Sequence, residues 1–443
     1  MRHATRLLLL AVCLLTHGSA FAAPTTAPAR PPPLMRDFIG LNVHTVQFKP
    51  DLYAPVCRRL RDYHPVRWDV GADPATPTVF PFAANKVHWG NLYGGWTKAG
   101  YDVDACLMFD DLPAAAWKDK PDAARAYGEA FAKAFGPSSR TPVVTAAEVG
   151  NEPAKYAESE YRAIFEGMAR GLRAGDPKIL ISTCAVMTGK PDQWSKPTSA
   201  VAGLEGLYDV LNVHTYPFKE KWPTWRRSYP EDPTIRFVAD VRDLLAWRDA
   251  HAPGKQVWVT EFGYDASTKP PAKTGDFAKW VGNTDDEQAR YSVRAFLVLA
   301  AAGVDRAYLY FFNDKDEPKL HAASGITRDF KPKPAFHAVA HLSATLGDYR
   351  LSRVVSQTAG GVYCYEFAHA TKPDDRVYVA WLATDADAPT MHLVLIGDAA
   401  AKRVTAAERM PTAPGNAPKV TWKPAPGGVE ADLGGAPVYL RTR

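Results

Sequence analysis

The sequence predicts an α/β protein in which a (β/α)8 barrel at residues 34–347 is followed by a β-sandwich domain at residues 348–443. Three observations support this prediction. Eight apolar, strand-like runs recur along the chain, and amphipathic helical stretches separate several of them. After about Tyr349 this pattern gives way to short alternating runs bounded by turn residues. A chain of 443 residues is long enough for one large domain and a smaller one.

The eight apolar runs are predicted to be the parallel strands of the barrel. Each is nearly continuous in apolar residues, as expected of strands that are buried on both faces. Eight strand–helix repeats of this kind are typical of a TIM barrel. In chain order the runs are Phe38–Val43, Val66–Val70, Ala105–Phe109, Val143–Val149, Ile179–Thr183, Val210–Val213, Val257–Thr260 and Ala307–Phe311.

The clearest helices are predicted at Tyr161–Leu172 and Asp285–Ala302. Thr284 precedes the second helix and Glu287 follows three residues later, which is a capping-box pattern. An open, doubly wound sheet is the competing architecture. It is disfavoured because no glycine-rich phosphate-binding loop follows any of the predicted strands.

The C-terminal stretch alternates short β-type runs with Gly, Pro, Asp and Asn, which is typical of a β-sandwich, and no helix is needed to explain it. The runs are Val362–Phe367, Val377–Leu382, His392–Leu395 and Val438–Leu440. No charged or catalytic cluster stands out there. We interpret this domain as packing against the flank of the barrel, with carbohydrate binding as the open alternative.

The N-terminus has the pattern of a secretory signal peptide at residues 1–22. Arg2 and Arg6 supply the positive start, Leu7–Leu15 the apolar stretch, and an Ala-Phe-Ala sequence at residues 20–22 the cleavage pattern. The protein is therefore expected to be secreted or periplasmic.

A Pro- and Ala-rich linker is predicted at residues 23–33. A lipoprotein cysteine at Cys13 is the alternative to signal-peptide cleavage, and it is disfavoured because apolar residues continue beyond it. No segment after the signal is long and apolar enough to insert into a membrane.

Composition excludes some partners. The formal net charge of +5 is too small to argue for nucleic acid or an anionic membrane surface. No metal-ligand spacing is present, so neither a metal nor another cofactor is predicted, and the oligomeric state is left open.

We interpret the four cysteines beyond the signal as buried free thiols, although an even count also permits disulfides: Cys57, Cys106, Cys184 and Cys364.

Two carboxylates are the candidates for chemistry. Glu152 follows the fourth apolar run and Glu261 ends the seventh. In a TIM barrel, catalytic groups sit where strands end and loops begin, so both would face one cleft. Buried carboxylates are costly without a partner or a task. Two that share a cleft can cleave a glycosidic bond, with retention if they are about 5–5.5 Å apart and with inversion at about 6.5–9.5 Å.

Five elements in strand order resemble the retaining glycoside hydrolases of clan A, over roughly Phe38–Gly347. The layout is most similar to glycoside hydrolase family 39, including its exopolysaccharide-cleaving members. The Glu-Val-Gly-Asn-Glu-Pro motif at residues 148–153 also resembles that of families that act on uronic-acid polymers. The elements are Arg67 ending strand two, Asn151-Glu152-Pro153 ending strand four, His214-x-Tyr216 ending strand six, Thr260-Glu261-Phe262-Gly263 ending strand seven and the aromatic run Tyr308–Phe312 ending strand eight.

This resemblance implies roles for individual residues. Glu152 would be the acid/base with a raised pKa, and Glu261 the ionised nucleophile. Arg67 and Tyr216 would hydrogen-bond the nucleophile, and His214 would lie along the cleft floor. Asn151 would bond the sugar 2-OH, and His44 and Tyr310 would line the sugar site.

Each assignment has a structural alternative. The two glutamates could be ion-pair partners in the barrel mouth, and Arg67 could pair with Glu148 instead. His44 and His214 could be satisfied core histidines. The remaining carboxylates near strand ends, Asp265 and Asp110-Asp111, are interpreted as subsite or loop residues.

Two loops suggest a carbohydrate partner, with an anionic polysaccharide as one candidate. The loop after strand six interleaves Trp222, Trp225 and Tyr229 with basic residues that include Arg226 and Arg227. Such a loop could stack sugars and pair with carboxylates or sulfates, with Trp225 as a substrate-binding residue. The loop after strand two adds His88, Trp89, Tyr93 and Trp96. The alternative is that these loops bury their own aromatic rings.

The sequence thus predicts a retaining glycoside hydrolase that cleaves β-linked poly- or oligosaccharides. Two alternatives stay open: a transglycosylase that uses the same residues, and a carbohydrate-binding barrel that has lost its chemistry. A metal-dependent hydrolase is disfavoured because no ligand cluster is visible.

Overall fold

The computed structural model describes residues 30–83, 86–117 and 121–442. Internal contacts divide the chain into residues 1–31 and a compact unit at residues 32–443. The predicted signal peptide (residues 1–22) and residues 23–29 of the predicted linker lie outside the described residues.

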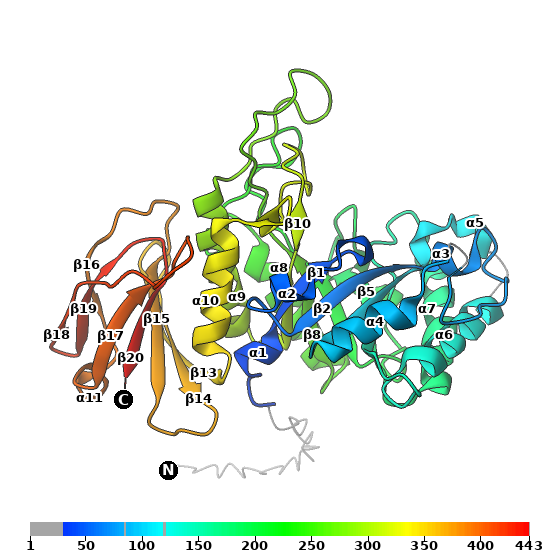
Figure 1. Ribbon diagram of the computed structural model, residues 1–443, viewed down its shortest axis with the longest axis horizontal. Helices are drawn as coiled ribbons and strands as arrows, with labels where there is room; N and C mark the ends of the chain where they lie inside the picture. Colours follow the sequence, from blue (N-terminus) through cyan, green and yellow to red (C-terminus); the bar gives the residue numbers. More distant parts are fainter. Residues whose placement is uncertain (1–29, 84–85, 118–120, 443) are drawn as a thin grey trace, which may run out of the picture. The chain divides into compact units, whose positions relative to one another are not determined.

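Within the described residues, eight parallel strands close into a barrel, as the sequence predicted (Figure 1). Neighbouring strands pair in the order β4-β3-β2-β1-β9-β8-β7-β5, and β4 pairs with β5 to complete the ring. The short β6 (Lys196–Pro197) pairs in parallel with the C-terminal end of β5. The barrel strands are β1 (Ile39–Val43), β2 (Arg59–Pro65), β3 (Asp102–Met108), β4 (Val144–Val149), β5 (Leu180–Met187), β7 (Val210–His214), β8 (Gln256–Phe262) and β9 (Arg306–Leu309).

The prediction for the second strand was wrong. Residues Val66–Val70 form the short helix α3, and the strand is the preceding segment, Arg59–Pro65. This strand escapes a search for apolar runs because it carries Arg61, Asp62 and His64, all fully buried. Partners on other strands and on the surrounding helices satisfy these groups, so the barrel tolerates them inside.

Helices surround the barrel strands, and the two clearest predictions are confirmed. The helix predicted at Tyr161–Leu172 is α7 (Glu158–Gly175), and α9 spans Asp285–Ala302. The capping box is present, because the Thr284 hydroxyl accepts from the Glu287 amide at 3.1 Å and the Glu287 carboxylate accepts from the Thr284 amide at 2.7 Å. The other helices up to the end of the barrel are α1 (Met35–Phe38), α2 (Pro50–Tyr53), α4 (Trp89–Lys98), α5 (Ala114–Trp117), α6 (Pro121–Phe135), α8 (Phe237–His251) and α10 (Pro334–Leu346).

The remaining elements of the barrel region are short. The 3-10 helices are η1 (Thr45–Gln47), η2 (Phe109–Asp111) and η3 (Thr198–Ala200). A small sheet in the segment between β9 and α10 contains β10 (Asn313–Asp314), β11 (Thr327–Arg328) and β12 (Lys331–Pro332).

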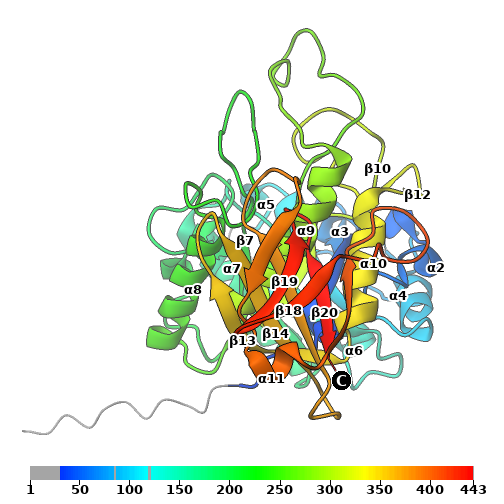
Figure 2. The same cartoon turned by 90° about the vertical axis from the view of Figure 1, so that its left-hand side faces the viewer.

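The C-terminal stretch forms two antiparallel sheets, in agreement with the predicted β-sandwich (Figure 2). The expectation that no helix is needed was wrong in one place, because Asp398–Ala401 forms the one-turn helix α11. The predicted boundary after residue 347 falls between α10 and β13. One sheet has the order β13-β14-β15-β20-β17 and the other β16-β19-β18, with bounds β13 (Tyr349–Gln357), β14 (Val362–His369), β15 (Arg376–Leu382), β16 (Thr390–Val394), β17 (Val404–Arg409), β18 (Trp422–Ala425), β19 (Gly428–Leu433) and β20 (Val438–Thr442).

A buried ion pair of the barrel is hydrogen-bonded to the C-terminal sheets. Arg294 of α9 donates to Glu231 from its Nε at 3.0 Å, and Glu231 also accepts the indole N–H of Trp381 at 2.7 Å. Arg294 further donates to the backbone carbonyl of Thr384 at 2.7 Å. Figure 1 shows α9 and α10 between the barrel strands and the two sheets.

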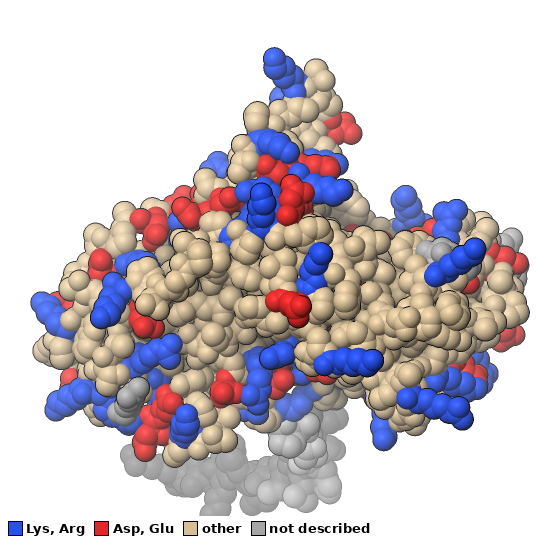
Figure 3. Space-filling view, in the orientation of Figure 1, with Lys and Arg blue, Asp and Glu red and all other residues tan. Residues whose placement is uncertain are grey.

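The remaining sequence-level expectations concern cysteines, membranes and charge. The four cysteines of the described part are buried and not bonded to one another. Among the described helices, none has the length and apolar character that crossing a bilayer requires. On the face shown in Figure 3, positive and negative side chains are interspersed.

Candidate active site

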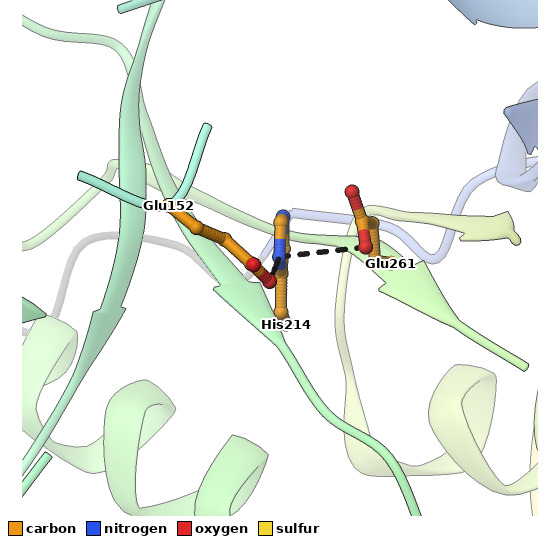
Figure 4. A group of neighbouring side chains, drawn as sticks. All are labelled: Glu152, His214 and Glu261. Carbon is orange, nitrogen blue, oxygen red and sulfur yellow. Dashed lines mark hydrogen bonds and ion pairs between the residues drawn. The ribbon is translucent and has the colours of Figure 1, made fainter. Parts of the chain in front are cut away.

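The two predicted glutamates meet at the carboxyl ends of the barrel strands. Glu261 lies in β8, Glu152 follows β4, and His214 ends β7 between them (Figure 4). Nδ1 of His214 lies 2.8 Å from a Glu152 oxygen and 3.7 Å from a Glu261 oxygen. One carboxylate oxygen of each glutamate and a ring nitrogen of His214 all lie within 4.8 Å of one another.

Glu261 is surrounded by donors and cations. Its Oε1 accepts from Arg61 at 2.9 Å and from the Tyr63 hydroxyl at 2.6 Å, and its Oε2 accepts from the Tyr216 hydroxyl at 2.8 Å. Burial alone would raise the pKa of Glu261. The charges of His214 and Arg61 and the two tyrosine hydrogen bonds outweigh burial and lower this pKa to about 2. Glu261 is therefore ionised at neutral pH.

Arg61 organises the floor of the site. Its guanidinium is fully buried and binds Glu148 through two hydrogen bonds of 2.9 and 2.6 Å. It also donates to the side-chain oxygens of Asn42 at 2.9 Å and Asn151 at 2.8 Å. Because Arg61 can only donate, it fixes the amide oxygen of Asn151 toward itself. The Asn151 amide nitrogen then has no partner among the described residues.

Glu152 is carried by a turn that the sequence specifies. Gly150 has a φ of 85°, a left-handed conformation that favours glycine. After this turn, the Asp110 carboxylate accepts the backbone N–H groups of Asn151 at 3.3 Å and Glu152 at 3.2 Å. Burial raises the pKa of Glu152, and the charge of Glu261 acts in the same direction, against the contact with His214.

The hydrogen bonds of His214 define where its proton lies. The Thr260 hydroxyl donates to Asn212 at 2.5 Å, so it accepts from Nε2 of His214 at 3.0 Å. Nε2 is therefore protonated. Nδ1 faces Glu152, and the two groups share one proton: a protonated Glu152 donates to Nδ1, or a protonated His214 donates to the carboxylate.

The charges around His214 favour keeping that proton in the pair. Burial lowers the pKa of His214, but the charges of Glu261 and Glu152 and the hydrogen bond to Glu152 outweigh burial and raise it. Glu152, His214 and Glu261 offer the donor types that a metal ion uses. Both ring nitrogens of His214 are already engaged in hydrogen bonds, so this trio fits proton sharing better than metal ligation.

Two hollows meet at Glu152 and Trp194, which line both. We call the first the Tyr310 pocket; its volume is about 680 Å³, and Tyr310 and Glu261 line it. We call the second the Trp225 pocket; its volume is about 730 Å³, and Trp225 and His214 line it. Both volumes fall in the range of about 300–1,000 Å³ that is common for small-molecule sites.

The structure gathers most of the predicted site residues at these pockets. His44 lines the Tyr310 pocket with its ring stacked on Tyr63, and Asn151 lines it as well. Tyr216 lines the Trp225 pocket. The geometry predicted for Arg67 was wrong, because Arg67 is an exposed residue of α3 and, among the described contacts, bonds neither Glu261 nor Glu148. Arg61 makes both contacts instead.

Several residues of the site were missed by the sequence reasoning. Arg61 and Tyr63 were not identified because strand β2 was predicted at the wrong residues. Trp68, Trp194 and His321 also line the Tyr310 pocket. They lie in helix α3 or in loops, where nothing in the local sequence marks them. The one available signal for β2 was the run of ionisable residues directly before Pro65. Such a run is typical of an exposed segment, and only its buried partners in the structure show that it lies inside the barrel.

The structure settles where the loop aromatics and arginines lie. Trp89, Tyr93 and Trp96 are fully buried, so the alternative that this loop buries its own rings is correct for them. Arg227 is also buried, and it forms an ion pair with Asp265 at 2.9 Å. Arg226 is exposed at the surface and lies 3.8 Å from Glu220.

Comparisons with known proteins identify the fold. A scan against protein-family models matches none, and no curated protein matches the sequence. Among solved structures, the chain is similar to a family 39 glycoside hydrolase from Bacteroides cellulosilyticus WH2, with a TM-score of 0.65 at 17% identity, covering 92% of this chain and 81% of that one.

Two further solved structures match over almost their whole length. A glucosidase from Croceicoccus marinus has a TM-score of 0.60 at 12% identity, covering 94% of this chain and 98% of that one. The family 51 α-L-arabinofuranosidase AbfB from Bifidobacterium longum has a TM-score of 0.60 at 13% identity, covering 95% and 97%. The chain therefore has the fold of these TIM-barrel glycoside hydrolases, including the additional sheets.

Proposed function

We propose that the protein is a retaining glycoside hydrolase that cleaves β-linked poly- or oligosaccharides by double displacement. One observation carries this proposal: two carboxylates with oppositely shifted pKa values have oxygens within 4.8 Å of each other in one cleft. This separation is close to the 5–5.5 Å of retaining enzymes and too short for the water that inversion requires.

In the first step, Glu261 attacks the anomeric carbon while Glu152 gives its proton to the leaving oxygen. Arg61, Tyr63 and Tyr216 hold the attacking carboxylate ionised and aimed. The free amide N–H of Asn151 is placed to donate to a sugar hydroxyl that faces the nucleophile. The products are a glycosyl ester on Glu261 and the released aglycone.

In the second step, water attacks the same carbon, the ester bond to Glu261 breaks, and Glu152 takes the proton from that water. His214 supports both steps because it shares one proton with Glu152. When Glu152 has donated the shared proton, its carboxylate and Nδ1 of His214 are both acceptors, so the pair is ready to take the proton of the attacking water.

The mechanism assigns the two pockets. The nucleophile must lie beneath the sugar whose bond is cut, so the Tyr310 pocket holds the glycone. The acid/base must face the leaving group, so the Trp225 pocket beyond Glu152 and Trp194 holds the aglycone. Trp225 there rests on Phe218 with 5.7 Å between ring centroids and is placed to stack against a leaving sugar.

If the substrate is an anionic polysaccharide, two lysines are better placed than the loop arginines to bind its charged groups. Arg227 is committed to Asp265, whereas Lys190 and Lys221 line the Trp225 pocket and are exposed. A carboxylate or sulfate on the substrate would therefore be bound on the aglycone side. The N-terminal signal pattern supports action outside the cytoplasm on secreted or periplasmic polysaccharide.

The test of this proposal is covalent trapping. A reactive cyclitol probe of β-glycoside configuration is expected to label Glu261, as located by peptide mass spectrometry, and to leave the Glu261→Gln variant unlabelled. Labelling of another residue, or turnover by Glu261→Gln at the wild-type rate, would contradict the proposal.

A second variant tests the acid/base. Glu152→Ala is expected to lose activity on substrates with poor leaving groups and to recover it with azide on an activated aryl β-glycoside, giving a β-glycosyl azide. An α-azide would indicate inversion. Binding of glycans with no turnover of any would favour a carbohydrate-binding barrel, and oligosaccharide products longer than the substrate would indicate a transglycosylase.

A further inference from the structure

His321 is a half-buried residue of the Tyr310 pocket that the mechanism above does not use. It lies between β10 and β11, in the segment that joins β9 to α10. Its ring meets that of Tyr216 edge-on at 4.4 Å between centroids and that of Tyr310 at 5.9 Å. Because Tyr216 binds the nucleophile, His321 stands beside the position of the sugar whose bond is cut.

The protonation of His321 follows from its partner. Nδ1 lies 3.1 Å from Nη2 of Arg227, and a guanidinium can only donate. Nδ1 must therefore accept, so the ring is neutral and its single proton is on Nε2. The pKa of His321 agrees with this, because burial and the charge of Arg227 lower it to about 4. Nε2 has no hydrogen-bond partner among the described residues.

Three loops hold this ring in place. Asp265, after β8, pairs with Arg227 at 2.9 Å, and Arg227 comes from the loop between β7 and α8. Asp265 also accepts the backbone N–H of His321 at 3.1 Å and the Ser324 hydroxyl at 2.6 Å. Arg227 donates in addition to the carbonyl of Gly263 at 2.7 Å. The Nε2–H is thus a preorganised donor, with its partners buried behind it.

The charges that line the pocket point to the kind of sugar that this donor meets. The acidic side chains on its wall are Asp111, Glu152 and Glu261, and no Lys or Arg is among the described residues that line it. Its two histidines do not supply a cation, because His321 is neutral and burial lowers the pKa of His44. Arg61 is already paired with Glu148 and Glu261, so a carboxylate on the glycone would face the ionised Glu261 with no cation on the pocket wall to pair with.

We propose that His321 binds a glycone hydroxyl through Nε2–H, and that the Tyr310 pocket selects an uncharged sugar over the corresponding uronate. This inference rests on the proposed function for the orientation of the substrate. It places any anionic group of the polymer on the aglycone side, where Lys190 and Lys221 lie.

The role of His321 is tested by two substitutions that each keep one half of the ring's hydrogen bonding. In His321→Asn, the amide oxygen can still accept from Arg227, but the shorter side chain holds its N–H groups short of the position of Nε2. In His321→Gln, the longer side chain can place its amide N–H near the position of Nε2. The probes are methyl β-thioglycosides, which resist hydrolysis, and binding to each variant is measured by calorimetry.

The expected result is a Kd about tenfold higher for His321→Asn and less than threefold higher for His321→Gln. Equal binding by wild type and His321→Asn, with both proteins folded by circular dichroism, overturns the role of His321. Equal losses in both variants overturn it too, because the donor would then not be what matters.

The charge preference is tested on the wild-type protein with matched thioglycoside pairs: glucoside and glucuronide, galactoside and galacturonide, mannoside and mannuronide. In every pair that binds, the neutral sugar is expected to bind at least tenfold more tightly. A uronate that binds as well as its neutral partner overturns the inference, as does failure of every neutral glycoside to bind. If neutral thioglycosides bind but the matching aryl glycosides are not turned over, the proposed function is contradicted and this inference is not. If aryl glycosides are turned over but uronates bind more tightly, this inference is contradicted and the proposed function is not.

Discussion

Glu152 and Glu261 carry the same carboxyl group, yet their neighbours shift the two pKa values in opposite directions. Burial acts to raise both. Around Glu261 it is outweighed by His214, Arg61 and two tyrosine hydroxyls, whereas around Glu152 only His214 opposes it. A difference of this kind is what lets one carboxyl act as an acid while the other stays ionised as a nucleophile.

This asymmetry predicts the pH dependence of kcat/KM. Activity needs Glu261 ionised, so it is lost as pH falls through the pKa of Glu261. Activity also needs Glu152 protonated, so it is lost as pH rises through a pKa above the ordinary value for Glu. A bell-shaped profile with its acid limb at low pH is expected from initial rates across pH. An acid limb near the ordinary Glu pKa would contradict the proposed environment of Glu261.

Tyr63→Phe is expected to shift that acid limb by about one pH unit toward neutral, because it removes one of the hydrogen bonds that lower the pKa of Glu261. Tyr310→Phe is the matched control. Tyr310 lines the same pocket but makes no hydrogen bond to Glu261 among the described contacts, so its removal should change substrate affinity and leave the acid limb in place. Equal shifts in both variants would show that the effect is not specific to the hydrogen bond.

At the scale of an element, strand β2 shows how a polar segment can lie inside a barrel. Arg61 points to the interior, where Glu148 of β4, Glu261 of β8 and Asn42 of β1 meet it. Five donors on one planar group satisfy partners from several strands at once. The strand is therefore stabilised by pairing across the barrel, which no property of residues 59–65 alone reveals.

The interior position of Arg61 in β2 and the exposed position of Arg67 in α3 predict different effects of substitution on the free energy of unfolding. Arg61→Met leaves the buried carboxylates of Glu148 and Glu261 without their cation, so the free energy of unfolding is expected to fall by about 3–5 kcal/mol. Arg67→Met changes an exposed side chain and is expected to alter it by about 0.5 kcal/mol or less. Urea denaturation of both variants measures this, and similar losses would argue against the interior position of Arg61.

The prediction of elements from sequence succeeded where apolar periodicity determines the structure. Helix α9 was predicted with its observed bounds, because its capping box and its long apolar pattern are local. Strand β2 was missed and α3 was taken for it, because the apolar side chains of Val66–Val70 fit both a strand and a short buried helix. Length and periodicity cannot separate these two over five residues.

At the scale of the whole molecule, the C-terminal sheets contact a loop that lines the Trp225 pocket. Glu231 lies in the segment between β7 and α8, as does Trp225, and it is held by Arg294 of α9 and by Trp381 of β15. The sheets therefore support a loop of the cleft from behind. None of their residues lines either pocket among the described residues.

Trp381→Phe is expected to lower the free energy of unfolding by about 1–3 kcal/mol, because it removes a buried hydrogen bond to the charged Glu231, whose other donor is Arg294. KM for a polymeric substrate should rise as the loop loosens, with little change for a small aryl glycoside. Trp422→Phe, in β18 away from this contact, is the control and should change neither KM. Unchanged stability in Trp381→Phe would show that the sheets and the loop are not coupled through Glu231.

The sequence by itself determined the barrel with its C-terminal sheets and the placement of Glu152, Asn151 and Glu261 at strand ends. These follow from patterns within a few neighbouring residues: apolar runs, a glycine turn at Gly150 and carboxylates at run ends. Only the tertiary structure decided which arginine pairs with Glu261, that Arg227 pairs with Asp265, and that His321 lines the Tyr310 pocket. Each of these depends on contacts between groups far apart in the chain, where a buried charge is stable only through partners that folding brings to it.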